Sequence, residues 1–81
     1  MNEKVLALVL SAKHDRNIKF ADLRNLLVGL NFSERIKGDH FIYKKEELPE
    51  RINIQPDGDM AKGYQVRQVR NIIRKYKLGD E

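Results

Sequence analysis

Residues 37–43 read KGDHFIY, in which a glycine turn opens into an aromatic and aliphatic strand, with a histidine where the turn becomes the strand. A glycine that can adopt a positive φ angle favours a tight hairpin turn, and the aromatic and β-branched residues after it favour a strand. Strand alternation puts Phe41 and Tyr43 on one face of the sheet and His40 with Ile42 on the other. Which of these faces meets the helices is left open by the pattern.

The segments around this turn predict a meander of three antiparallel strands. Residues 32–37 alternate as a half-buried strand, with Ile36 on its inner side and a partly cationic outer side. Residues 44–50 form a charged loop whose proline ends the pairing. Residues 51–54 alternate again as a third strand, and the turn-rich residues 55–63 form a loop.

Three helices are predicted from apolar side chains that recur at helical spacing. The first covers residues 2–12, and Asn2 is its expected N-cap. The second covers residues 20–30, and Asn31 is the candidate left-handed residue that ends it. The third covers residues 64–77 and carries a basic face. The expected fold is therefore α+β, in the order helix, helix, three strands, helix, with the helices on one face of the sheet.

Composition narrows the classes of function. The 81 residues fit a single domain with a modest core. Sixteen Lys and Arg against twelve Asp and Glu give a formal charge of +4, which favours an anionic partner, although excess lysine also serves solubility. The lack of cysteine excludes disulfides, a thiolate zinc site and a cysteine nucleophile, and it suits a reducing compartment. The apolar run at residues 5–10 is too short to span a bilayer, so we expect a cytoplasmic protein without a membrane anchor.

Several alternative sites lack the residues that they need. His14 lies in a polar loop far from His40 in the chain, and scattered carboxylates do not complete a metal site with either. Asp57 and Asp59 flank a glycine, but no glutamate closes a calcium-binding loop. The second predicted helix has too few polar side chains to read base edges, which argues against a helix-turn-helix protein. We expect neither a metal nor a cofactor.

One histidine among cations can support RNA cleavage. RNA carries its own nucleophile, the 2′-hydroxyl, and a neutral imidazole at His40 can take its proton without a metal. Nearby cations, Lys37 first among them, can stabilise the charge on the phosphoryl oxygens. The candidate RNA-binding residues share a positive charge and lie near His40 or along the last helix: Arg35, Lys37, Lys44, Lys62, Arg67, Arg70 and Arg74. From the residues alone the conclusion stops at a small basic nucleic-acid-binding domain.

The step to an enzyme comes from a resemblance carried by four segments in order. They are LNF at 30–32, GDHFIY at 38–43, INIQP at 52–56 and KGYQVRQVR at 62–70. Over about residues 18–78 the chain resembles the HicA (YcfA-like) family, small bacterial mRNA interferase toxins of type II toxin–antitoxin systems. The resemblance implies a fold similar to double-stranded-RNA-binding domains and endonucleolytic cleavage of mRNA by His40. It also implies a HicB-like antitoxin that covers this corner.

The chain departs from the HicA pattern in three places. Phe41 stands where many members have a second histidine, and Asn31 replaces the usual glycine. Residues 1–17 form an N-terminal helix and loop extension beyond the shortest members. Two other functions stay open: a non-catalytic or degenerate RNA-binding domain that uses the basic helix and strand face, and a protein-interaction module for an acidic partner.

Overall fold

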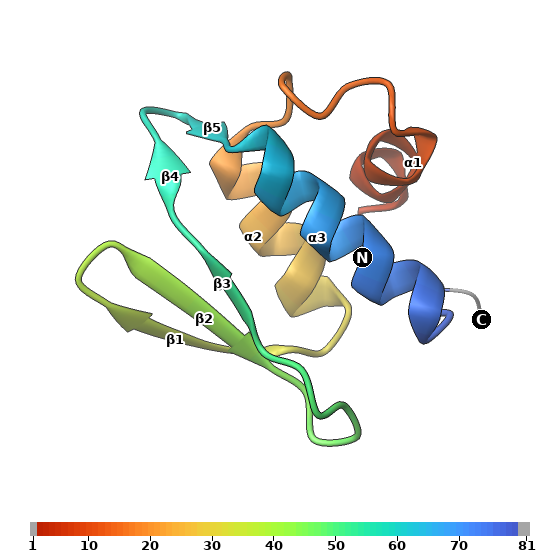
Figure 1. The fold of residues 1–81 in the computed structure, drawn as a ribbon, viewed down its shortest axis with the longest axis vertical. Coiled ribbons are helices and arrows are strands. Elements are labelled where there is room, and N and C mark those ends of the chain that lie inside the picture. Colours follow the sequence, from red (N-terminus) through yellow and green to blue (C-terminus); the bar gives the residue numbers. More distant parts are fainter. Residues whose placement is uncertain (1, 80–81) are drawn as a thin grey trace.

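The computed structural model describes residues 2–79 and has the predicted α+β architecture (Figure 1). Its elements are α1 (Glu3–Ser11), α2 (Phe20–Gly29), β1 (Ser33–Lys37), β2 (His40–Lys44), β3 (Ile52–Ile54), β4 (Pro56–Asp57), β5 (Met60–Ala61) and α3 (Gly63–Lys75). Strands β1, β2 and β3 form one antiparallel sheet in that order. In the described part of the chain, no helix has the length and apolar character needed to cross a membrane.

The helices begin and end close to the predicted positions. The side-chain oxygen of Asn2 accepts a hydrogen bond from the N–H of Val5 at 3.1 Å, which confirms the N-cap of α1. Asn31 follows α2 with a φ of 71°, so the predicted left-handed terminator is confirmed. Helix α1 ends one residue early because Ala12 adopts a φ of 60°. Helix α3 ends at Lys75 rather than at 77.

The helices cover one face of the three-stranded sheet, and the other face is open. The rings of Phe41 and Phe20 meet edge to face with centroids 4.9 Å apart, and Tyr43 is fully buried. These contacts put Phe41 and Tyr43 on the helix side of β2, so His40 and Ile42 lie on the opposite face. The buried core draws on all three helices and the sheet, and its fully enclosed members include Val9, Leu23, Leu26, Leu27, Ile52, Ile54, Val66 and Val69.

The β1–β2 hairpin extends past the helices at its turn (Figure 1). Gly38 adopts a φ of 62° there, and Lys37 pairs directly with His40 across the two-residue turn. The expectation of a half-buried β1 is wrong at this end of the strand. Ile36 belongs to the helix side by alternation, yet 52% of it is exposed because no helix reaches that far along the hairpin.

A second, shorter hairpin replaces the loop expected between β3 and α3. Strands β4 and β5 pair with each other rather than with the main sheet. The N–H of Ala61 donates to the carbonyl of Ile18 at 2.8 Å, and the N–H of Phe20 donates to the carbonyl of Asp59 at 2.9 Å. The hairpin therefore fixes the start of α2 against the start of α3.

Candidate active site

His40 is the first residue of β2 and stands on the open face of the sheet. Half of its side chain is exposed, at 50%. Its position follows from the turn, because the left-handed Gly38 reverses the chain immediately before it. A histidine packed among core side chains could not reach RNA, whereas this imidazole is accessible.

Both nitrogens of the His40 ring have a polar neighbour from the adjacent chain segment. Nδ1 lies 3.3 Å from the side-chain oxygen of Asn53, and Nε2 lies 3.2 Å from the side-chain nitrogen of Gln55. This arrangement fits the neutral imidazole whose proton is on Nδ1: Nδ1–H donates to Asn53 and Nε2 accepts from the Gln55 amide. In that tautomer Nε2 is the basic atom. A carboxylate oxygen of Asp39 is 3.9 Å from the same nitrogen.

Helix α3 holds the Gln55 backbone in place through Gln65. This glutamine is almost completely buried, and its side-chain oxygen accepts a hydrogen bond from the N–H of Gln55 at 3.1 Å. Its side-chain nitrogen donates to the hydroxyl of Tyr64 at 3.4 Å. A buried polar group of this kind is costly unless it is bonded, so Gln65 fixes the end of β3 beside His40.

The strand cations gather on the same face as His40. Lys37 is the direct cross-strand neighbour of His40. Arg35 pairs with Ile42 across the hairpin. Arg35 and Lys44 line a shallow hollow of about 170 Å³, together with Ser33, Ile42 and Arg51.

Sequence reasoning missed three residues of this face, namely Arg51, Asn53 and Gln55. They occur at every second position, the period that places side chains on one face of a strand. Asn53 pairs with Ile42, which lies on the same face of β2 as His40. Asn53 and its neighbours Arg51 and Gln55 therefore share that face. The sequence shows that these three residues alternate onto one face of the sheet. It does not show that this face is the open one.

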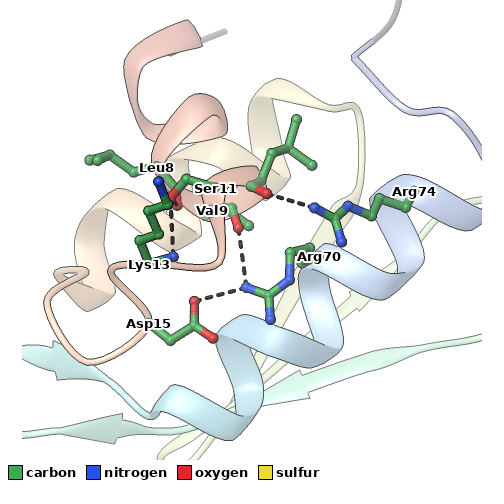
Figure 2. Close-up of polar contacts among 8 residues, drawn as sticks. Leu8, Val9, Ser11, Lys13, Asp15, Arg70 and Arg74 are labelled. Carbon is green, nitrogen blue, oxygen red and sulfur yellow. Dashed lines mark hydrogen bonds and ion pairs between the residues drawn. The ribbon is translucent and has the colours of Figure 1, made fainter.

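The basic residues of α3 do not join this face as a group. Lys62 is the half-buried residue that precedes α3, and Arg67 is exposed on the helix. Arg70 is buried, and one guanidinium nitrogen donates to the carbonyl of Val9 at 3.2 Å and to the carboxylate of Asp15 at 2.8 Å (Figure 2). The assignment of Arg70 to RNA binding is therefore wrong, because its guanidinium is buried and paired with groups inside the protein.

Arg74 has a similar structural contact. Its guanidinium donates to the carbonyl of Leu10 at 2.7 Å (Figure 2). The carbonyls of Val9 and Leu10 belong to the last turn of α1 and have no partner within that helix. Arg70 and Arg74 thus attach the C-terminal end of α1 to α3, which gives the N-terminal extension a structural role.

On the helix side of the sheet, three polar side chains, Arg24, Glu34 and Tyr43, connect the sheet to α2. Arg24 makes a two-pronged ion pair with Glu34, both contacts being 3.0 Å, and the Tyr43 hydroxyl donates to the same carboxylate at 2.5 Å. The hydrogen bonds from Arg24 hold the pKa of Glu34 below its ordinary value. Burial, followed by the Glu34 carboxylate, raises the pKa of Tyr43. This group lies on the face opposite His40 and supports the hairpin that presents it.

Residues 2–79 contain no cluster of three or more His, Asp or Glu side chains arranged to hold a metal ion. Comparison of the chain with known proteins matched no family model, no curated protein and no solved structure.

Proposed function

We propose that the chain is a ribonuclease toxin of the HicA kind, which binds mRNA in the cytoplasm and cleaves it with His40. The observation that carries the proposal is the half-exposed imidazole on a cationic sheet face, whose Nε2 lies 3.2 Å from the side-chain nitrogen of Gln55. The order of motifs in the sequence supports the same conclusion. A HicB-like antitoxin that covers the open face would switch the activity off.

The proposed reaction needs only groups of the RNA and of this face. Nε2 of His40 takes the proton of a 2′-hydroxyl, and the 2′-oxygen bonds to the adjacent phosphorus as the bond from phosphorus to the 5′-oxygen breaks. The products are a 2′,3′-cyclic phosphate and a 5′-hydroxyl, and the proton that His40 took from the 2′-hydroxyl balances the one that the 5′-oxygen gains, passed on directly or through solvent. Lys37 and Arg35 stabilise the negative charge on the phosphoryl oxygens. The substrate hydroxyl takes the place of the Gln55 amide at Nε2.

The test compares a single-stranded RNA incubated with wild type, His40→Ala and His14→Ala. We expect His40→Ala to lose about 10²- to 10⁴-fold in cleavage rate, the usual contribution of a general base. His14→Ala is the matched control, because His14 is the other histidine and is exposed in a loop. Growth arrest on expression should follow the same order.

A second substrate separates this mechanism from its competitors. RNA with 2′-O-methyl groups lacks the nucleophile and should bind but resist cleavage. A His40→Ala protein that cleaves as fast as wild type would contradict the proposal. Salt-sensitive binding without any product would favour the non-catalytic RNA-binding domain, for which the exposed cations of the open face are sufficient.

A further inference from the structure

Tyr64 is the most exposed of the aromatic side chains among residues 2–79. It lies in the first turn of α3 and is 61% exposed. The other five aromatic residues in the described part of the chain are buried or half-buried, and those of β2 face the helices. Apart from the His40 imidazole, the open sheet face therefore offers no aromatic ring on which a base could stack. Tyr64 is an exposed ring that hydrogen bonds connect to this face.

Three contacts connect Tyr64 to His40. The Tyr64 hydroxyl accepts from Gln65 at 3.4 Å, the Gln65 oxygen accepts from the N–H of Gln55 at 3.1 Å, and the Gln55 amide lies 3.2 Å from Nε2 of His40. This network links the position of Tyr64 to that of His40 through Gln65 and Gln55.

Tyr64 also lines a hollow that contains two cations. This hollow measures about 500 Å³, and Arg16, Lys62, Asp57 and Met60 contribute to its walls. Arg16 comes from the loop after α1, and a Cβ built on Gly63 would lie 3.7 Å from its Cγ, so the Arg16 stem runs close beside the backbone of α3. Two cations against the single carboxylate of Asp57 leave the hollow positive, and Met60 adds an apolar surface.

We propose that this hollow, defined by Tyr64, Arg16 and Lys62, binds one unpaired nucleotide of the RNA next to the cleaved bond. Its base stacks on the Tyr64 ring, and its phosphate contacts Arg16 and Lys62. An exposed aromatic beside cations is the arrangement by which proteins hold single strands without reading sequence. The inference rests on the proposed function and adds to it the substrate class, because a base within a duplex is already stacked and is not free to bind the ring.

The experiment measures binding of a 2′-O-methyl oligouridine, which cannot be cleaved, to wild type and four variants. Tyr64→Ala should weaken binding about five- to a hundredfold, the range found for loss of one base–aromatic stack. Tyr64→Phe keeps the ring and should bind as wild type. Arg16→Ala should weaken binding and lower the salt dependence by about one phosphate contact. Lys13→Ala is the charge control, because Lys13 is exposed in the same loop and does not line the hollow.

A strand of the same length without bases isolates the stacking contact. On this abasic strand, wild type and Tyr64→Ala should bind equally, since no base is present to stack. Equal binding of wild type and Tyr64→Ala to the oligouridine, or a Tyr64→Phe protein as weak as Tyr64→Ala, overturns the inference. Circular dichroism and thermal melting confirm that each variant folds, as expected for exposed positions.

The outcomes separate this inference from the proposed function. If wild type cleaves RNA and loses the activity with His40→Ala while Tyr64→Ala binds normally, the nucleotide site alone is wrong. If binding depends on Tyr64 and no RNA is cleaved, the ribonuclease proposal is wrong and the site stands. A wild-type protein with no affinity for the oligouridine overturns both.

Discussion

The side-chain nitrogen of Gln55 lies 3.2 Å from Nε2 of His40. An amide nitrogen only donates hydrogen bonds, so this contact suits an imidazole with a free lone pair on Nε2. A doubly protonated ring would face the amide with a second donor, and Gln55 would have to turn its oxygen inward. Gln55 is therefore a positioning residue that orients the His40 ring.

Replacing Gln55 should change the rate of cleavage and leave RNA affinity almost unchanged. Gln55→Leu removes the contact that sets the ring orientation before the substrate hydroxyl displaces the Gln55 amide. We expect cleavage about ten- to a hundredfold slower because the ring is then less well positioned when the substrate arrives. Gln55→Glu places a carboxylate against Nε2 and favours the imidazolium, which cannot accept a proton. Its rate should be lower still at neutral pH and should recover as the pH rises.

Single-turnover cleavage across pH values, with binding measured on 2′-O-methyl RNA, checks this prediction. The pH profile is the decisive reading, because a merely structural loss would lower the rate equally at all pH values. Identical profiles for wild type and Gln55→Glu would contradict the positioning role. The exposed Asn71 on α3 offers a matched control, Asn71→Asp, which adds the same charge away from the sheet.

Local sequence patterns predicted the three helices and the three strands of the main sheet. Contacts between distant residues decided which sheet face meets the helices and where the β4–β5 hairpin forms. Alternation at residues 40–43 placed His40 and Phe41 on opposite faces, and the structure assigned Phe41 to the helix side. The β4–β5 hairpin was missed because its support comes from backbone bonds to Ile18 and Phe20, some 40 residues away in the chain. No local period carries that information.

Charged side chains were the least predictable part of the site. A helical wheel shows on which side of α3 Arg70 lies. It does not reveal that the end of α1 and Asp15 pack against that side chain. The position of Glu34 was also not predictable from its own strand. Its side chain points toward the helices, where Arg24 of α2 forms an ion pair with it. Tertiary partners decide whether a charge is available to a ligand.

Removing Arg70 should destabilise the protein rather than weaken RNA binding directly. Arg70→Ala deletes a buried ion pair, leaves the carboxylate of Asp15 without its guanidinium donor and removes one of the two donors to the carbonyl of Val9, the other being the N–H of Ala12. We expect the free energy of unfolding to fall by about 2–4 kcal/mol. Urea denaturation measures this change. Arg67→Ala is the matched control on the same helix, and we expect it to stay within about 0.5 kcal/mol of wild type because Arg67 is exposed.

Stability should fall at acidic pH partly through Glu34. Its pKa in the folded protein lies below the ordinary 4.5 because Arg24 donates hydrogen bonds to it. The ionised carboxylate therefore stabilises the fold above about pH 4.5, and this contribution is lost as the pH falls from there through the lower pKa of the folded state. Glu34→Gln should lower stability at pH 7 and flatten the loss of stability on acidification. Urea denaturation midpoints between about pH 7 and pH 3 test this, and unchanged slopes would contradict it.

A second histidine at position 41 should not improve cleavage. Phe41 packs edge to face against Phe20, and the guanidinium of Arg24 lies 4.7 Å from its ring centroid, on the side of the sheet opposite His40. An imidazole at this position would face the helices and lie apart from Nε2 of His40. We expect Phe41→His to cost about 1–2 kcal/mol of stability through the lost aromatic and cation–π contacts. Cleavage per folded molecule should remain at the wild-type rate. Phe41→Leu, which removes the ring and adds no titratable group, is the control for packing, and a histidine variant that cleaves faster than both would show that position 41 reaches the substrate.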